Sequence, residues 1–410
     1  MPRAGGIDLP RRQLLLGSLS AAALLAGKHC VFAAAQPLKL GVLTDLSGAV
    51  VDFSGAGTIT SLKMAIEDFG GKVNGRPIEL RTADHFNKPD VGLATARRWY
   101  DEGVDAIFDV GMTSIALAVQ TLTRERNKTV IFISSSSTDL TGKACSPNGI
   151  HWSHNSFSQS VGTIRENLRN GRKSWYFITI DYTFGVASER DATRVIQAAG
   201  GRIVGSSRHP WDASDFSSQL LQAQASGADV IALATTTGHA GTIVKQAKEF
   251  GILEQQTIAP FSWGLHEVKA LGLATAQGLY SSAPFYWDEN ERSRAFADRY
   301  FTRLGRMPNE VQASAYGAMM HYLKAVSTVD PDNGTAVIAK MKETPINDFM
   351  TAEGVIRLDG RVMRDVLVFK VKSPTQSKGE WDIFEIVGKV PANEAFLPAD
   401  PTACPLAAKS

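Results

Sequence analysis

Long hydrophobic runs are almost absent from this 410-residue sequence. The main one, Leu14–Ala26, has 13 residues, whereas a helix that spans a bilayer needs ~20, so we expect no membrane anchor. An excess of one charge is also lacking. The first 35 residues hold four basic and one acidic side chain, so residues 36–410 carry 39 basic and 40 acidic ones. This balance excludes the basic surface typical of proteins that bind nucleic acids or membrane surfaces.

Motifs of the commonest enzymatic and nucleotide sites are missing as well. Gly55-Ala56-Gly57 is followed by Thr60, where a dinucleotide fingerprint has its third glycine. There is no G-x-x-x-x-G-K-[ST] phosphate loop and no G-x-S-x-G nucleophile elbow. His151 and His154 lie in a Pro/Asn/Gly-rich loop with no Cys or carboxylate in register. We therefore expect no catalytic residue, no metal and no cofactor.

The N-terminal segment is typical of an export signal. Arg11-Arg12 precedes the short apolar run, and Ala33-Ala34-Ala35 supplies an A-x-A cleavage site before Gln36. The arginine pair resembles a twin-arginine signal, although Leu stands where Phe is usual. We expect residues 1–35 to be cleaved near Ala35 and the mature protein to reach the periplasm.

Only three cysteines occur, and Cys30 lies within this export segment. Cys145 and Cys404 then remain as an even pair in an oxidising compartment. Two interpretations follow from the residues alone. Either the pair forms a disulfide that ties the C-terminal tail to a loop in the first third of the chain, or both thiols are free and buried.

Past residue 36 the sequence alternates short apolar strands with amphipathic helices. One such run begins at Leu38–Leu43 and ends near Ser134, and a second begins at Trp175–Ile180 and ends near Phe261. This alternation predicts two parallel sheets, each covered by helices on both faces. Residues 290–345 read mostly as helix. Strands return after Thr351, with Asp359-Gly360 as a hairpin turn.

The turns that follow the predicted strands are rich in hydroxyl and aromatic side chains. They cover residues 44–48 with Phe53, 111–114, 134–138, 181–185, 235–239 and 262–264. Ligands of doubly wound sheets bind at the carboxyl ends of the strands. Hydroxyls beside helix N-termini suit a carboxylate, and aromatics supply an apolar wall. Each Ser or Thr could instead cap its own helix, but their recurrence in both halves favours a small-molecule site.

The same segments resemble a known family. Residues 41–48, the 111–114 turn before Ala116–Val119, residues 134–141 and the 181–185 turn are similar to the leucine/isoleucine/valine-type periplasmic binding proteins of ABC importers. The resemblance covers residues 38–390. It implies an α/β fold of two doubly wound parallel-sheet lobes with a ligand cleft between them and hinge crossovers.

The resemblance also implies lobe boundaries. Lobe I is expected to comprise residues 36–153 and about 285–350. Lobe II is expected to comprise about 154–284 and about 351–390, with a tail at 391–410 that returns to lobe I. A subgroup of the family carries two cysteines in the same places, which favours the disulfide between Cys145 and Cys404.

Carried over by position, Ser114 and Thr138 would hold a ligand carboxylate, with the backbone of Ser136 nearby. Phe53 and Phe184 would line the cleft from opposite lobes. The second lobe would add polar contacts from residues 235–237 and 262–264. The predicted ligand-binding residues are therefore Phe53, Ser114, Ser136, Thr138, Tyr182, Phe184, Thr236 and Trp263.

One departure from the family bears on the ligand. Members that bind amino acids place an acidic residue in the segment that is Ser262-Trp263-Gly264 here, and Glu267 comes only later. A buried ammonium without a carboxylate partner is costly. We therefore expect an aromatic or aliphatic carboxylate or an amide at least as much as a branched-chain amino acid.

The function predicted from the sequence is capture of a small molecule by closure of two lobes, for delivery to a membrane permease. We expect a monomer and no enzymatic activity. Two alternatives remain: an exported ligand-sensing module that docks to a receptor, and a hydrolase that works in the cleft. The nearest approach to an acid–base pair, Asp84-His85, fits a strand-end turn equally well.

Overall fold

The computed structural model describes residues 36–48 and 50–409. The predicted export signal, with Arg11-Arg12 and the cleavage site at Ala35, lies outside these residues. From Pro37 onward the described chain forms one compact unit. Within the described part of the chain, no helix is both long enough and apolar enough to cross a bilayer.

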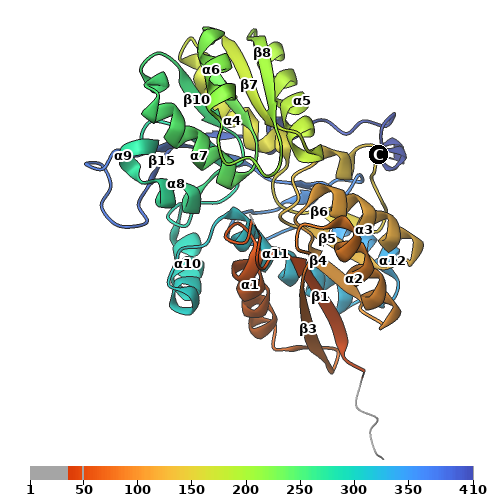
Figure 1. Ribbon diagram of the computed structural model, residues 1–410. Coiled ribbons are helices and arrows are strands. Elements are labelled where there is room, and N and C mark those ends of the chain that lie inside the picture. Colours follow the sequence, from red (N-terminus) through yellow and green to blue (C-terminus); the bar gives the residue numbers. More distant parts are fainter. Residues whose placement is uncertain (1–35, 49, 410) are drawn as a thin grey trace, which may run out of the picture. The chain divides into compact units, whose positions relative to one another are not determined.

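Six strands form the first sheet, in the order β2-β3-β1-β4-β5-β6 (Figure 1). Their bounds are β1 Leu38–Thr44, β2 Lys72–Val73, β3 Arg76–Asp84, β4 Ala106–Asp109, β5 Thr129–Phe132 and β6 Gly149–His151. All pair in parallel except β2, which runs antiparallel to β3 at the edge. The predicted strands at 38–43, 78–82, 104–110 and 129–134 are confirmed. The short strands β2 and β6 were not predicted.

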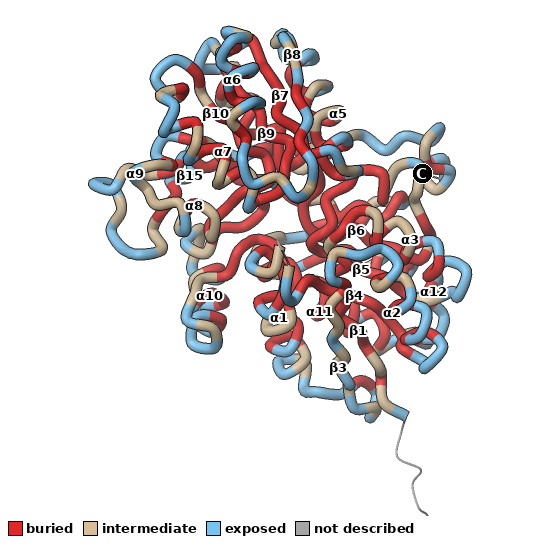
Figure 2. Tube along the Cα trace, viewed as in Figure 1, coloured by how far each residue is buried: buried red, intermediate tan, exposed pale blue. Residues whose placement is uncertain are grey.

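Helices cover both faces of this sheet because its strands alternate between two apolar clusters (Figure 2). Leu40 and Val42 point to one face, and Leu43 points to the other. The first face packs against α1 Gly55–Asp68, α11 Glu310–Val326 and α12 Gly334–Glu343, and the second against α2 Pro89–Asp101 and α3 Thr113–Glu125. Gly41 is required at the second face, since a Cβ there would lie 2.5 Å from the ring of Trp99.

The second sheet has four parallel strands in the order β10-β9-β7-β8. They are β7 Ser174–Ile180, β8 Arg202–His209, β9 Val230–Ala234 and β10 Thr257–Pro260. One face packs against α4 Ser156–Arg169 and α5 Thr183–Ala198, the other against α6 Ser217–Ala225 and α7 Thr237–Glu249. Helix α4 was missed from the sequence, because its hydroxyl-rich first turn hides the apolar positions that follow.

A third, antiparallel sheet β11-β14-β15 extends the second one and shares both of its apolar clusters. Its strands are β11 Tyr280–Ala283, β14 Val366–Val371 and β15 Phe384–Val390. The predicted hairpin turn at Asp359-Gly360 is confirmed, and Gly360 has φ 90°. It joins β12 Val355–Ile356 to β13 Val362–Met363, a short strand that was not predicted. The remaining helices are α8 Leu265–Leu271, α9 Leu273–Ala276, α10 Glu291–Leu304 and α13 Ala392–Ala395.

The chain passes between these sheets three times. It leaves the first sheet after β6, returns after β11 to α10 and α11, and leaves again after α12 for β14 (Figure 1). We call the first sheet with α1, α2, α3 and α10–α12 the first lobe. The second and third sheets with α4–α9 form the second lobe. This is the two-lobed α/β fold expected from the sequence; the exact residue boundaries of the lobes stay a prediction.

The C-terminal tail is fixed by a disulfide between Cys145 and Cys404, whose Cα atoms lie 5.8 Å apart. The disulfide interpretation is therefore confirmed over that of two free thiols. The tail is more buried than a surface segment: Cys404 and Phe396 are buried. The ring of Phe396 lies 4.6 Å from the guanidinium carbon of Arg361, a cation–π contact that holds the tail before the disulfide.

Replacing both cysteines, in Cys145→Ser/Cys404→Ser, should lower the free energy of unfolding by ~2–4 kcal/mol, because the bond closes a long loop in the unfolded chain. Urea denaturation with and without reductant measures the effect. Reductant should destabilise the parent protein and leave the double variant unchanged. A parent protein indifferent to reductant would contradict the stabilising role.

Candidate ligand-binding site

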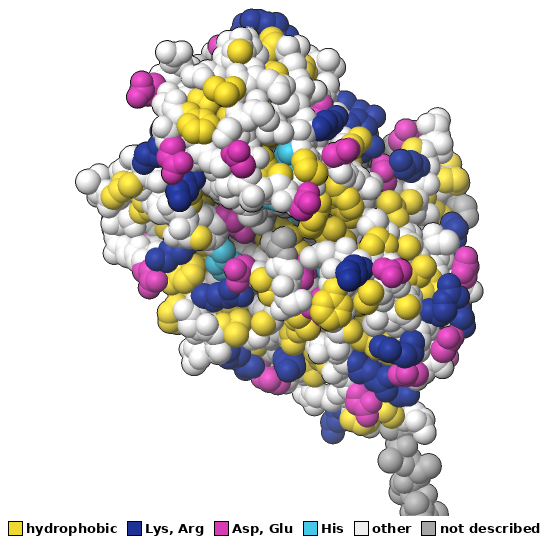
Figure 3. Space-filling view, in the orientation of Figure 1, with side chains coloured by type: hydrophobic (Ala, Val, Ile, Leu, Met, Phe, Trp, Pro, Cys, Tyr) yellow, Lys and Arg dark blue, Asp and Glu magenta, His cyan; other side chains and the backbone are white. Residues whose placement is uncertain are grey.

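A cavity lies where the two lobes meet. On the face shown in Figure 3, hydrophobic side chains gather along the line between the lobes. The cavity draws residues from both lobes and is lined by Val50, Phe53, Gly111, Met112, Thr113, Ser134, Ser136, Tyr182, Phe184, Trp211, Thr236, Thr237 and Ser262.

Every lining residue follows the carboxyl end of a parallel strand. Residues 50–53 follow β1, 111–113 follow β4, and 134–136 follow β5 in the first lobe. In the second lobe, 182–184 follow β7, Trp211 follows β8, 236–237 follow β9 and Ser262 follows β10. In each sheet the strand order reverses beside the first strand, between β1 and β4 and between β7 and β9. Such switch points are where open α/β sheets bind ligands.

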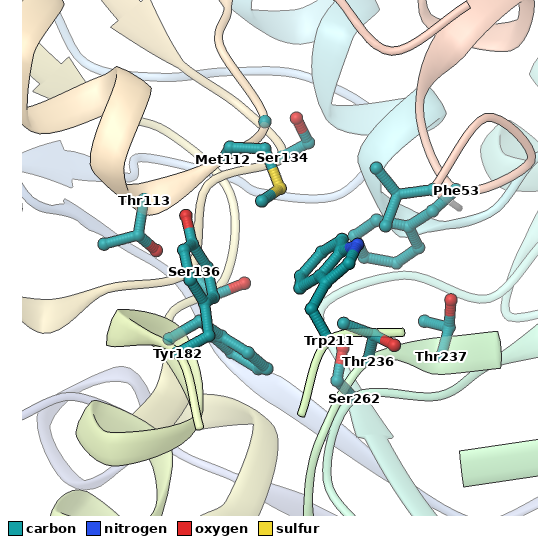
Figure 4. Close-up of a pocket in the computed structure, with 13 residues that line it drawn as sticks. Phe53, Met112, Thr113, Ser134, Ser136, Tyr182, Trp211, Thr236, Thr237 and Ser262 are labelled. Atoms are coloured by element: carbon teal, nitrogen blue, oxygen red, sulfur yellow. The ribbon is translucent and has the colours of Figure 1, made fainter. Parts of the chain in front are cut away.

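The walls of the cavity are aromatic and hydroxylic (Figure 4). Tyr182 and Trp211 meet edge to face with their ring centroids 5.4 Å apart, and both pack against the first-lobe cluster that contains Met112. None of the described residues that line the cavity is Asp, Glu, Lys, Arg or His. A ligand here meets apolar surface and neutral hydrogen-bonding groups.

Five of the eight residues predicted from the sequence lie in this lining. They are Phe53, Ser136, Tyr182, Phe184 and Thr236. Phe53 comes from the first lobe and Phe184 from the second, on opposite lobes as expected. Their contact with a ligand stays a prediction.

Ser114 lies next to the cavity but is not part of its lining. Its backbone N–H donates to the hydroxyl oxygen of Tyr182 at 3.1 Å, and its own hydroxyl lies 2.9 Å from the same oxygen. Burial raises the pKa of Tyr182, so the phenol stays neutral. The groups expected to hold a ligand carboxylate are instead bonded to a side chain of the other lobe.

Thr138 and Trp263 also lie away from the cavity. The Thr138 hydroxyl donates to the Asp191 carboxylate at 2.8 Å and accepts from Arg190 at 2.7 Å. Arg190 also pairs with Asp139 at 3.2 Å, so this cluster joins the loop after β5 to α5 of the other lobe. Trp263 is buried in the second-lobe core, where its indole N–H donates to the Tyr280 carbonyl at 3.4 Å.

Val50 and Trp211 are the lining residues that lie outside the turns singled out in the sequence analysis. The sequence pattern predicts a strand at Arg202–Gly205 before Trp211, whereas β8 continues to His209. Burial alternates along this edge strand, but its inward positions Gly205, Ser207 and His209 are not apolar, and this hid its true length. The signal that could have found Trp211 is Pro210, which ends the strand one residue before an aromatic.

With the fold and the cavity in place, comparison with known proteins decides the family. The family model described as periplasmic binding protein matches residues 37–380. This chain belongs to that family. No curated protein matches it.

Solved structures agree with this membership. A periplasmic binding protein from Burkholderia mallei is 39% identical with a TM-score of 0.86, covering 88% of this chain and 97% of the other. A branched chain amino acid ABC transporter periplasmic ligand-binding protein from Burkholderia xenovorans LB400 is 37% identical with a TM-score of 0.79, at the same coverage. An ABC transporter solute binding protein from Rhodopseudomonas palustris BisB5, in complex with 3,4-dihydroxy benzoic acid, shares the fold at 20% identity and a TM-score of 0.76, covering 87% and 98%.

In this periplasmic binding protein a row of buried polar groups lies behind the lining residue Ser136. Its hydroxyl lies 2.9 Å from Nε2 of His154, whose Nδ1 lies 3.9 Å from the Glu310 carboxylate. Burial, with the nearby Arg361, lowers the pKa of His154 to about 3, and burial raises the pKa of Glu310 to about 8. Both side chains are therefore mainly neutral at neutral pH.

The two histidines of the 151–154 loop are both bonded within the protein. His151 belongs to β6, and its Nε2 lies 2.7 Å from the Ser135 carbonyl. Both His151 and His154 are buried. Asp84, of the alternative acid–base pair, accepts the Phe86 N–H at 2.7 Å in the turn that ends β3.

Glu310 should make stability depend on pH. Its folded pKa, about 8, lies above its ordinary value of 4.5, so its contribution is present below 4.5 and is lost as the pH rises through about 8. Each pKa unit corresponds to ~1.4 kcal/mol. As the pH rises, the free energy of unfolding of Glu310→Gln should therefore fall by at least ~1 kcal/mol less than that of the parent protein. Thermal melts across that pH range measure it. An equally steep fall in the variant would contradict the assignment.

Proposed function

We propose that this periplasmic binding protein captures a small ligand with an apolar body and one carboxylate, and presents it to the permease of an ABC importer. The observation that carries the proposal is the cavity between the lobes. It is walled by aromatic rings from both lobes, and its described lining residues carry no charge. A ligand that touches both walls favours the closed arrangement, because only that arrangement offers both sets of contacts.

Helix N-termini favour an anionic group on the ligand. Helices α3, α5 and α7 begin at Thr113, Thr183 and Thr237, and residues of all three first turns or caps line the cavity. None of their N-cap residues supplies a side-chain cap. Uncapped amides at the positive end of the helix dipole stabilise an anion without any Lys or Arg.

The alternative ligands are an amide and a branched-chain amino acid. An amide fits the neutral donors and acceptors equally well but gains less from the helix dipoles. A free ammonium would lack a carboxylate partner in the lining and would pay a desolvation cost. The protein from B. xenovorans is described as the periplasmic ligand-binding protein of a branched chain amino acid ABC transporter, and that from R. palustris as a complex with 3,4-dihydroxy benzoic acid. Both descriptions support a small organic ligand.

Export to the periplasm and a partner protein in the membrane are part of the same proposal. The basic N-terminal segment and the A-x-A site support cleavage near Ala35 and a periplasmic location. The disulfide fits an oxidising compartment. We propose that the mature protein works as a monomer with a membrane permease. A receptor that senses the ligand remains the second candidate, since the same lobe closure could signal to it.

Binding without catalysis is supported by the groups beside Ser136. A serine nucleophile needs a histidine base that an ionised acid orients through a hydrogen bond. The 3.9 Å between His154 and Glu310 exceeds hydrogen-bond length, and the raised pKa of Glu310 leaves that acid mainly protonated. With its lowered pKa, His154 is also a poor proton acceptor.

A thermal-shift screen of mature protein against benzoates, short aliphatic acids, their amides and branched-chain amino acids tests the ligand class. A carboxylate at 100 times its Kd should add ~2.7 kcal/mol of stability. Small-angle scattering of the same samples should show compaction. Stabilisation by leucine or valine alone would contradict a plain carboxylate, and binding without compaction would contradict closure.

A further inference from the structure

The first-lobe position for a carboxylate is already occupied by the protein. At the start of α3, the Ser114 N–H and hydroxyl both contact the Tyr182 hydroxyl oxygen, at 3.1 and 2.9 Å. Tyr182 comes from the second lobe, and it packs against the first-lobe cluster beside Trp211. A ligand carboxylate at Ser114 would have to displace this phenol and break a bond between the lobes.

Among the described lining residues, Thr113 is the one first-lobe residue whose hydroxyl bonds to no other residue, whereas the second lobe offers two such hydroxyls side by side with a free indole N–H. Thr237 and Ser262 are 5% and 7% exposed and line the cavity, and neither hydroxyl bonds to another residue in the described part of the chain. The indole N–H of Trp211, a donor only, likewise has no partner among the described residues. In Figure 4 these three side chains lie on one side of the cavity, across from Thr113. Hydrogen-bonding groups that face a cavity without a protein partner can bond a ligand, so these three point to a bound acceptor.

Helix α7, on the same side of the cavity, also favours an acceptor group of the ligand. Helix α7 begins at Thr237, and its N-cap residue Thr236 turns its hydroxyl toward His239 Nδ1, at 3.0 Å, and not to the helix amides. Burial lowers the pKa of His239, so no full positive charge stands at this end. The amides of the first turn therefore remain free to face an acceptor, with the favourable end of the helix dipole behind them.

We propose that the carboxylate of the ligand binds on the second lobe, among the Thr237 hydroxyl, the Ser262 hydroxyl and the Trp211 indole N–H, while Tyr182 fills the position at α3. This rests on the proposed function and reverses the arrangement carried over from the family resemblance. The apolar body of the ligand then lies toward Phe53 and Met112 of the first lobe. The first lobe closes over the ligand through Tyr182 and Ser114.

Matched variants on the two lobes test this placement. Thr237→Val and Thr113→Val make the same change at the first position of α7 and of α3. Calorimetric titration with benzoate against benzamide, and isocaproate against isocaproamide, gives an acid-to-amide affinity ratio for each protein. Thr237→Val should lower this ratio about tenfold, because it removes a hydrogen bond to a charged group. Thr113→Val removes a lining hydroxyl of the first lobe, so it should change the affinities for acid and amide alike and keep the parent ratio. Ser262→Ala should behave like Thr237→Val.

The outcomes distinguish a wrong placement of the carboxylate from a wrong ligand class. A ratio that falls in Thr113→Val and stays constant in Thr237→Val and Ser262→Ala overturns the second-lobe placement and leaves the proposed function intact. If the parent protein binds neither acid, the proposed carboxylate ligand is rejected, and the placement with it. Circular dichroism and unliganded melts confirm that each variant is folded, and Thr121→Val, on the exposed face of α3, serves as the surface control.

Discussion

Parallel strands impose the constraint on which this structure depends: their carboxyl ends all finish at one edge of the sheet. Where the strand order reverses, the flanking helices lie on opposite faces and the edge between them is left open. This protein has two such edges, beside β1 and beside β7, and residues from both edges line the same cavity. The cavity is the consequence, because each loop that lines it starts where a strand stops.

Contacts between the lobes determine which of those loop residues have hydroxyls that can still bond a ligand. Ser114 and Thr138 look equivalent to Thr237 and Ser262 as hydroxyls near helix starts. The first two are bonded across the lobe boundary, to Tyr182 and to Asp191. Their hydrogen bonds hold the lobes together, whereas the other two hydroxyls face the cavity unpaired. We propose that this difference separates the residues that close the lobes from those that bind the ligand.

Most of the architecture could be predicted from the sequence because it is local. The parallel strands, the hairpin at Asp359-Gly360 and the hydroxyl-rich strand ends all depend on neighbouring residues. The disulfide was one of two open interpretations until the family resemblance favoured it. What escaped prediction depends on packing at long range. Trp211 follows an edge strand whose inward positions carry few apolar residues, and the partners of Ser114 and Thr138 lie 68 and 53 residues away.

The ligand inference changed for the same reason. From the sequence, a missing acidic residue near Trp263 argued against a plain amino acid. In the structure Trp263 lies in the core, so that argument now rests on the uncharged lining as a whole. The buried acid Glu310 lies behind Ser136, and burial, with its neighbour Glu267, raises its pKa, so it offers little charge to an ammonium.

A crystal structure of the mature protein with a bound carboxylate tests the central claim most directly. The account predicts the ligand enclosed between the lobes, its carboxylate within hydrogen-bond distance of Thr237 and Ser262, and Tyr182 still bonded to Ser114. A carboxylate bonded to Ser114 with Tyr182 displaced, or a ligand outside the cavity between the lobes, would contradict it.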